Sequence, residues 1–130
     1  MTVSTAKPKI LVIEDHAEIL TIMALILKRA GFEVATAQTG RAGIELAQRG
    51  EFDLITVDIS LPDISGFEVC SRLKQNFRFC GTPVIFVSGR LSEEDRRRAF
   101  EAGAADFIFK PFDAHVFASR IFSHLKMVKT

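Results

Sequence analysis

Apolar residues recur along the chain in five short runs, and each run is followed by a segment in which apolar residues have a helical spacing. The runs are continuous rather than alternating, and they are rich in branched and aromatic side chains. Such runs are typical of strands that are buried on both faces of a parallel sheet. We predict strands at residues 9–13, 32–37, 52–57, 83–87 and 106–109.

The segments between these strands carry helix start and stop signals. Ser92 and Asp95 form a capping pattern before one helix, and Asp113 caps the last one. Gly103 closes the helix that Ser92 caps, and Gly31 closes the first helix. We predict helices at residues 17–30, 41–49, 66–76, 93–102 and 114–128. Five strand-then-helix units predict an α/β fold, a doubly wound (βα)5 arrangement with a five-stranded parallel sheet covered by helices on both faces.

The first predicted helix is unusually apolar. Ile19, Ile22, Met23 and Ile26 form a stripe at helical spacing, which we expect to face the core. A second apolar set falls on the flank or outside, where a solvated helix would be polar. This second set consists of Leu20, Ala24 and Leu25. Wide burial of the helix and a docking patch for a partner helix are both open interpretations of it.

Composition places the chain among soluble globular domains, with 48% hydrophobic and 25% charged residues. Its 130 residues fit one domain that buries roughly two-thirds of its surface on folding. The net charge of +1 gives no whole-chain argument for binding nucleic acid or a membrane surface. The first residues lack the apolar region of a signal peptide, and the apolar stretch at residues 19–27 is too short to span a bilayer. We therefore expect a cytoplasmic protein with no membrane partner.

The cysteines and histidines show no pattern that predicts chemistry. Cys70 and Cys80 fit neither a disulfide framework nor metal-ligand spacing, so we expect both to be reduced packing residues. His16, His115 and His124 have no ligand spacing, and we do not expect them to bind a metal. Three consecutive arginines at residues 96–98 are interpreted as a solvated helix face, with a partner contact as the alternative.

Polar residues that could bind a ligand or take part in a reaction follow four of the five predicted strands. The first strand ends in Glu14 and Asp15, the third in Asp58, the fourth in Ser88 and the fifth in Lys110. In a doubly wound fold, ligands bind outside the carboxyl ends of the strands, where the strand order reverses. We therefore expect three acids, a hydroxyl and an amine to meet at one edge of the sheet.

Such a cluster suits phosphoryl transfer onto a carboxylate. Crowded carboxylates repel by about 4 kcal/mol per pair at a separation of about 4 Å and an effective dielectric constant near 20. Mg²⁺ relieves this repulsion, because it takes one or two carboxylates and leaves room for phosphate oxygens. A lysine can hold a phosphoryl oxygen, and an aspartate can itself be the nucleophile. The metal and the lysine would neutralise the charge that develops.

The motifs at these strand ends resemble those of the receiver domain of bacterial two-component response regulators. The matching pieces are VIEDH, DISLPDISG, VSG and FIFKPF, in that order, and the resemblance extends from about residue 9 to residue 126. It implies a flavodoxin-like strand order, 2-1-3-4-5. We expect residues 1–8 to be a flexible N-terminal segment and residues 9–130 to be the receiver domain.

The resemblance also implies a role for each matching residue. Asp58 would be the phosphoacceptor, and Asp15 and Asp58 would bind Mg²⁺ together with the backbone carbonyl of Ser60. Glu14 would act on the metal mostly through water, and Lys110 would contact a phosphoryl oxygen. The hydroxyl of Ser88 would turn toward the phosphoryl group. In the family the peptide bond that corresponds to Lys110–Pro111 is usually cis.

One position departs from the commonest pattern of the family. The switch aromatic three residues before the lysine is often tyrosine, but here it is Phe107, and the chain contains no tyrosine. A phenyl ring can rotate between exposed and buried positions, but it cannot donate a hydroxyl hydrogen bond.

The resemblance further implies a function and partners. The chain would receive its phosphoryl group from a histidine kinase or a histidine phosphotransfer protein, which would dock on the patch formed by Leu20, Ala24 and Leu25. The change would pass to the surface around helix 4, strand 5 and helix 5, and a homodimer through that surface is left open. The chain would be a phosphoacceptor that assists its own phosphorylation and dephosphorylation, and not an enzyme with a separate substrate.

Other function classes fit less well. A dinucleotide-binding domain or a P-loop nucleotidase would need a glycine-rich turn after the first strand, where the sequence is EDHAEI. A Mg²⁺-dependent phosphohydrolase would want a second acid two residues after Asp58, where Ser60 stands. A phosphate-independent interaction module would be favoured if Asp15, Asp58 or Lys110 were replaced, and none of them is. Direct nucleic-acid binding by this chain is not expected.

Overall fold

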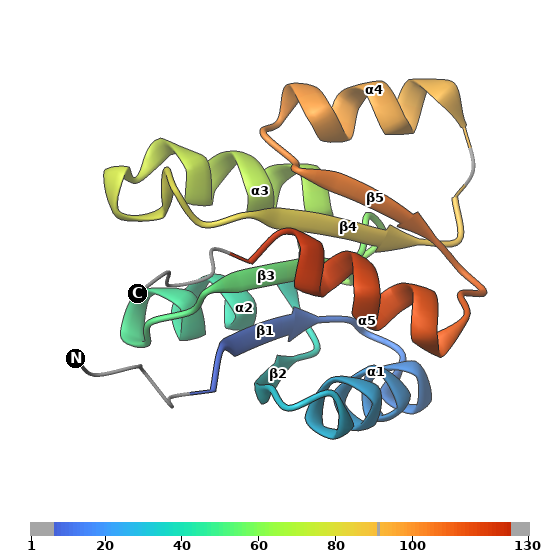
Figure 1. The fold of residues 1–130 in the computed structure, drawn as a ribbon. Helices are drawn as coiled ribbons and strands as arrows, with labels where there is room; N and C mark the ends of the chain where they lie inside the picture. The colour runs from blue at the N-terminus through green and yellow to red at the C-terminus, as the bar shows by residue number, and fades with distance from the viewer. Residues whose placement is uncertain (1–6, 91, 126–130) are drawn as a thin grey trace.

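The computed structural model describes residues 7–90 and 92–125, which form a five-stranded parallel sheet between two layers of helices (Figure 1). The strand order is β2-β1-β3-β4-β5, as predicted. The strands are β1 (Lys9–Ile13), β2 (Glu33–Ala37), β3 (Leu54–Val57), β4 (Val84–Ser88) and β5 (Asp106–Phe109). The helices are α1 (Ala17–Arg29), α2 (Gly40–Arg49), α3 (Gly66–Gln75), α4 (Glu93–Glu101) and α5 (Ala114–Ser123), with a short 3₁₀ turn η1 (Phe77–Phe79) after α3.

The two faces of the sheet carry two separate cores. Alternate side chains of β1 show this division, because Leu11 and Ile13 pack beneath α2, α3 and α4, whereas Ile10 and Val12 pack beneath α1 and α5. Every residue of β3 and β4 is buried, which explains why these strands are continuous apolar runs. The edge strand β2 is partly exposed, and its sequence EVATA is correspondingly less apolar.

The predicted elements are all present among the described residues, with small shifts at their ends. The strand predicted at 52–57 begins only at Leu54, and Ser88 belongs to β4 rather than following it. The last helix is described to Ser123, and the predicted end near residue 128 lies outside the described residues. Residues 1–6 of the predicted N-terminal segment also lie outside them. Among the described helices, none is long and apolar enough to cross a membrane.

The predicted core stripe of α1 is confirmed at Met23, which is buried, and at Ile19 and Ile26, which pack partly buried against the core, but it is wrong at Ile22. Leu20, Met23, Ala24 and Leu27 are the buried set, whereas Ile22 is 52% exposed. The reason is that α1 is apolar around most of its circumference, so two overlapping stripes have helical spacing in the sequence. Contacts with the sheet and with α5 decide which stripe is buried.

The two cysteines differ from each other. Cys70 is buried in α3, and its thiol donates to the carbonyl of Ala102 over 3.3 Å. Burial raises the pKa of this thiol to about 11, despite the nearby charge of Lys74, so it is an unreactive packing residue. Cys80 is also free, but it is exposed, so the expectation that it is a packing residue is wrong. It follows η1, a turn that the sequence analysis did not predict.

Candidate functional site

The carboxyl ends of β1, β3, β4 and β5 bring most of the predicted site residues to one hollow at the edge of the sheet, namely Asp15, Asp58, Ser60, Ser88 and Lys110, and Glu14 contacts Lys110 beside it. Parallel strands place these ends at the same edge of the sheet. The strand order reverses between β1 and β3, since β2 lies on one side of β1 and β3 on the other. The hollow is lined by Asp15, His16, Ile19, Asp58, Ser60, Ser88, Gly89, Arg90 and Lys110.

Lys110 is the central cation of this hollow. Its Nζ lies 2.5 Å from Oδ2 of Asp58 and 2.5 Å from Oε1 of Glu14. The Glu14 side chain is 1% exposed and that of Lys110 is 13% exposed, so all three groups are largely removed from water. The peptide bond between Lys110 and Pro111 is cis, as the resemblance implies.

Burial and charge shift the pKa values of these groups in different ways. Desolvation raises the pKa of Glu14, and the repulsion from Asp58 adds to this, although the contact with Lys110 and the backbone N–H of His16 oppose it. Burial alone would lower the pKa of Lys110, but its two carboxylate partners outweigh burial and raise the pKa. Lys110 is therefore held as an ammonium group between two acids.

The loop after β3 holds Asp58 closely in place. The backbone N–H of Ser60 donates to Oδ1 of Asp58 over 3.1 Å. Gly66 begins α3 directly beneath this loop, and a Cβ atom at that position would lie 2.1 Å from the carbonyl oxygen of Asp58. Only glycine allows this close approach, which explains the glycine eight residues after Asp58.

Asp63 fixes the far side of the same loop. Its two carboxylate oxygens accept the backbone N–H groups of Gly40 and Arg41, each over 2.8 Å, at the first turn of α2. Burial opposes the shift, but these N–H groups hold the pKa of Asp63 below its ordinary value. This contact was not predicted, because nothing in the sequence pairs residues that are 23 positions apart.

Asp15 differs from the other two acids in its contacts. Among the described residues, its buried Oδ1 has no hydrogen-bond partner. Nδ1 of His16 lies 3.6 Å from this oxygen and 3.5 Å from Oε2 of Glu14. A buried carboxylate oxygen without a donor is expensive unless a cation compensates it. An oxygen-rich hollow of this kind fits a hard divalent ion, and its residues therefore fit the magnesium implied by the resemblance.

Ser88 ends β4 and links the hollow to α4. The hydroxyl of Ser88 is buried and accepts the backbone N–H of Arg90 over 3.3 Å. The Arg90 guanidinium donates to Oδ1 of Asp95 over 3.0 Å, and Asp95 lies buried in the first turn of α4. The predicted capping pattern is confirmed, since the hydroxyl of Ser92 accepts the N–H of Asp95. The ion pair of Asp95 with Arg90 was not predicted.

Phe107 lies inside the protein beside this region. Its side chain is 2% exposed, and it stacks on Phe86 with ring centroids 6.2 Å apart. Phe109 packs against it at 5.0 Å. The ring therefore occupies a buried position in this structure, where a phenyl group leaves no hydroxyl to satisfy.

The predicted docking patch on α1 is only partly accessible. Leu20 and Ala24 are almost buried, whereas Leu25 is 47% exposed. A shallow hollow between α1 and β2 is lined by Leu20, Thr21, Ala24, Leu25, Lys28 and Thr36. The described part of the chain thus offers a small mixed surface here and not a broad apolar one.

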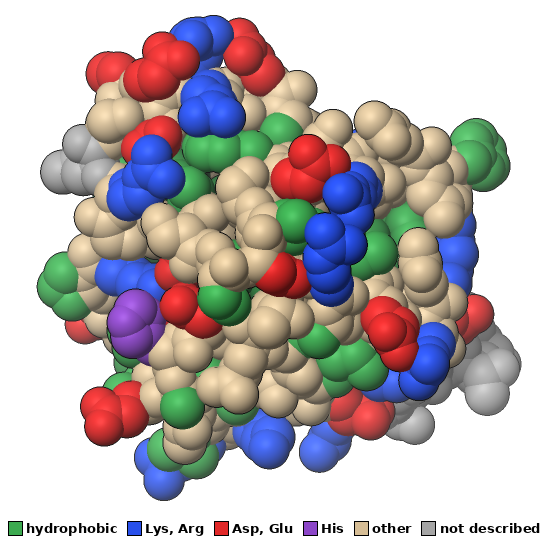
Figure 2. Space-filling view, turned by 180° about the vertical axis from the view of Figure 1, so that it is seen from behind, with side chains coloured by type: hydrophobic (Ala, Val, Ile, Leu, Met, Phe, Trp, Pro, Cys, Tyr) green, Lys and Arg blue, Asp and Glu red, His purple; other side chains and the backbone are tan. Residues whose placement is uncertain are grey.

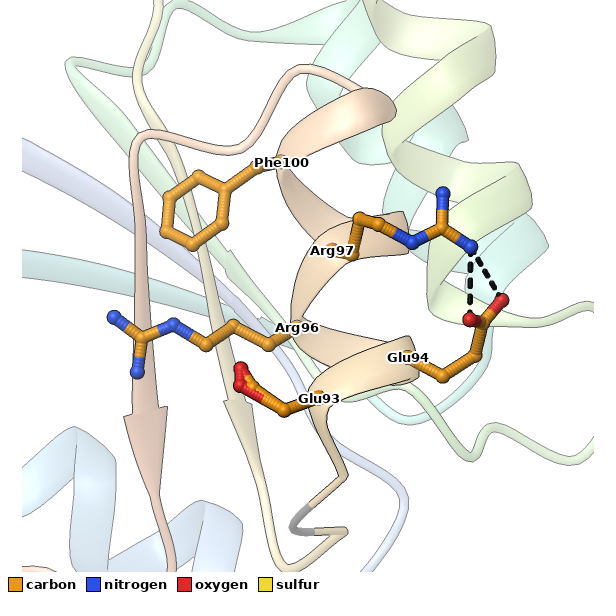
Figure 3. A pocket seen from close by; sticks show the side chains of 5 residues that line it. All are labelled: Glu93, Glu94, Arg96, Arg97 and Phe100. Carbon is orange, nitrogen blue, oxygen red and sulfur yellow. Dashed lines mark hydrogen bonds and ion pairs between the residues drawn. The ribbon is translucent and has the colours of Figure 1, made fainter.

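A second hollow lies on α4 and shares no lining residue with the hollow of Asp15, Asp58 and Lys110. Its lining residues are Glu93, Glu94, Arg96, Arg97 and Phe100 (Figure 3). Arg97 points away from Phe100 and forms two hydrogen bonds with Glu94. Figure 2 shows that charged side chains of both signs cover α4 at the top of the molecule. The predicted solvated face of residues 96–98 is confirmed, because all three arginines are exposed.

Comparison with known proteins identifies the class of protein. The model of the response regulator receiver domain family matches residues 10–122, and the chain belongs to this family. The chemotaxis protein CheY4 of Vibrio cholerae has a similar structure, with a TM-score of 0.89 and 28% identity over 92% of this chain and 100% of that one.

Similar sequences belong to transcriptional regulators. The chain is 39% identical to the regulatory protein AfsQ1 of Streptomyces coelicolor, over 88% of this chain and 49% of that protein. It is 35% identical to the DNA-binding dual master transcriptional regulator RpaA of Synechocystis, over 88% of this chain and 47% of that protein. The chain thus spans about half the length of these relatives. It is a receiver domain of the two-component response regulators.

Proposed function

We propose that this chain accepts a phosphoryl group on Asp58 from a phosphohistidine of a histidine kinase or a histidine phosphotransfer protein. The observation that carries the proposal is the ammonium group of Lys110, which follows β5 and lies 2.5 Å from Asp58 after β3 and 2.5 Å from Glu14 after β1. A cation at this distance from the nucleophile is placed to contact a phosphoryl oxygen after transfer.

Asp15, Asp58 and the backbone carbonyl of Ser60 would hold Mg²⁺, which neutralises charge on the phosphoryl oxygens when it is bound. One Asp58 oxygen attacks phosphorus, so that an O–P bond forms while the P–N bond to the donor histidine breaks. The imidazole leaves with the electron pair of that bond and takes a proton from water. Lys110 keeps its charge throughout and stabilises the transferred group.

The response to phosphorylation would use Ser88 and Phe107. Ser88 would turn its hydroxyl toward the phosphoryl oxygens, which gives up its contact with the N–H of Arg90. The ring of Phe107 would fill the space that Ser88 leaves behind it, and the change would reach the surface formed by α4, β5 and α5. That surface would contact an output or a second copy of the chain, and Leu25 with its neighbours on α1 would contact the phosphodonor.

The chain would assist its own phosphorylation and dephosphorylation without acting on a separate substrate. One relative, a probable cyclic di-GMP phosphodiesterase of Vibrio cholerae, is 32% identical to this chain, but the match covers only 26% of that protein. The activity in that relative's name therefore gives no argument for phosphodiesterase activity in this chain.

Phosphorylation of the purified chain by acetyl phosphate or phosphoramidate with Mg²⁺ tests the proposal. Intact-mass measurement should show one added phosphoryl group, which should disappear in Asp58→Asn and after chelation of the metal. Asp53→Asn, at an exposed position five residues before Asp58, is the matched control and should be labelled like the parent. Equal labelling of the Asp58→Asn variant would overturn the assignment.

A further inference from the structure

His16 lies at the mouth of the acidic hollow and is not used by the proposed phosphoryl transfer. Its backbone N–H donates to Oε2 of Glu14 over 3.1 Å, which turns the residue toward the acids. It precedes α1, but its side chain makes no capping hydrogen bond to that helix. The imidazole is 70% exposed, so the ring is free to take a ligand.

The imidazole nitrogen is close enough to the carboxylates to share a metal ion with them. Each of Glu14, Asp15 and His16 offers one ligand atom, and these atoms lie within 4.8 Å of one another. The Nδ1 atom of His16 is 3.6 Å from the unpartnered Oδ1 of Asp15. Metal–nitrogen and metal–oxygen bonds of about 2.0–2.2 Å place neighbouring ligand atoms roughly 3–4 Å apart. One ion could therefore bind both atoms with the backbone as it stands.

The other oxygens of the hollow divide between Lys110 and the metal. Lys110 already occupies Oε1 of Glu14 and Oδ2 of Asp58. Oδ1 of Asp15 has no donor among the described residues, and Oδ1 of Asp58 accepts only a backbone N–H from Ser60. An ion in this hollow would thus meet Asp15 and Asp58, with His16 beside them.

We propose that His16 supplies a nitrogen ligand to this site, so that the chain binds a borderline transition-metal ion such as Co²⁺, Ni²⁺ or Zn²⁺ in addition to Mg²⁺. Imidazole suits these ions, whereas Mg²⁺ prefers oxygen ligands and water. Mg²⁺ would therefore bind through the carboxylates and would not be coordinated by the imidazole of His16. The inference rests on the proposed function in using the same acids, and it departs from the expectation that no histidine of this chain binds a metal.

His124 shows why proximity to a carboxylate is not sufficient. Its Nε2 lies 3.0 Å from Oδ2 of Asp106, but the guanidinium of Arg120 occupies the same carboxylate. A cation is already present there, so a metal ion would have to displace it. At His16 the neighbouring Asp15 oxygen has no such partner among the described residues.

Metal titration of the untagged full chain tests the proposal. Dissociation constants for Co²⁺, Ni²⁺ and Mg²⁺ are measured by calorimetry for the parent, His16→Ala and the control His115→Ala, which removes another exposed histidine. His16→Ala should weaken Co²⁺ and Ni²⁺ binding by about 10–100-fold or more, by analogy with the loss of a metal-supporting group. Mg²⁺ binding should not change, and His115→Ala should bind all three ions like the parent.

The visible spectrum of bound Co²⁺ gives a second readout, because replacing a nitrogen ligand with water changes the ligand field. The spectrum should differ between the parent and His16→Ala at saturating Co²⁺. Equal Co²⁺ affinities or identical spectra in these two proteins would overturn the proposal. If the parent is not phosphorylated at Asp58 but binds Co²⁺ in a way that depends on His16, only the proposed phosphoryl transfer is overturned.

Discussion

The two ends of strand β5 carry opposite kinds of charge cluster. At its start, Asp106 is one acid with several donors: Arg120 of α5, His124 directly after that helix, and the backbone N–H of Phe107. At its end, Lys110 is one cation between two acids. The first cluster has enough donors to satisfy its carboxylate, whereas the second has more acids than one lysine can neutralise.

This difference separates a structural ion pair from a ligand site. Burial alone would raise the pKa of Asp106, but its donors outweigh burial and hold the pKa below the usual value. The pKa of Glu14 is raised instead, chiefly by desolvation. The surplus of negative charge at the Lys110 end is therefore costly without a further cation, and that cost is what a bound metal would remove.

The largest expected effect on stability is at the Lys110 end of β5. Lys110→Met should lower the free energy of unfolding by about 3–5 kcal/mol, because it leaves two buried carboxylates without their partner. Glu14 can take up a proton in this variant, which places the loss toward the lower end of that range. Urea denaturation in the absence of metal measures it.

Lys28→Met is the control for this variant, since Lys28 is an exposed lysine of α1. Its stability should match that of the parent. A Lys110→Met variant as stable as the control would mean that the acids do not depend on the lysine, and the comparison between the two ends would fail.

Removing one of the surplus acids should have a smaller effect of opposite sign. Asp15→Asn should raise the free energy of unfolding without metal by about 1–3 kcal/mol, because it relieves repulsion that Lys110 offsets only in part. The same change should abolish Mg²⁺ binding in a calorimetric titration. A variant clearly less stable than the parent would indicate that Asp15 makes a structural hydrogen bond.

The smallest effect on stability is expected at the Asp106 end of β5, and this effect should depend on pH. Asp106 has a folded-state pKa below its ordinary value of 3.8, so its stabilising contribution is present above that value and is lost as the pH falls through the folded-state pKa. Asp106→Asn should therefore destabilise the protein by about 1 kcal/mol near pH 7 and by progressively less below about pH 4.

Urea denaturation of parent and variant at several pH values measures this difference. Glu51→Gln, at an exposed position, should show no such dependence. A difference between parent and Asp106→Asn that stays constant down to low pH would mean that the carboxylate charge contributes nothing to the Asp106 cluster.

The strand-end residues were predictable from the sequence because topology alone brings them together. Once the chain is interpreted as a parallel sheet, Asp58 and Lys110 must reach the same edge, whatever the details of packing. The Asp106 cluster and the ion pair of Arg90 with Asp95 were not predictable in this way. They depend on how side chains of α4 and α5 are oriented, which no spacing in the sequence specifies.

The prediction that Ile22 belongs to the core stripe of α1 was wrong for a related reason. Ile22 and Leu20 are both apolar and both fit a helical period, so only contacts with neighbouring elements separate them. Asp63 is a similar case, because its contacts with the first turn of α2 join loops from different parts of the chain. Local patterns predicted the elements, and tertiary contacts decided which faces and loops meet.

The aromatic cluster of Phe86, Phe107 and Phe109 determines what optical spectroscopy can report on this protein. The chain contains twelve phenylalanines and no tryptophan or tyrosine, so phenyl rings are its only near-ultraviolet aromatic chromophores. Rings that are fixed in an asymmetric environment give sharp near-ultraviolet circular dichroism bands, and mobile exposed rings give little. A change in the packing of Phe107 would thus appear in the natural protein's own spectrum, without the overlapping tryptophan and tyrosine signals that mask phenylalanine in most proteins.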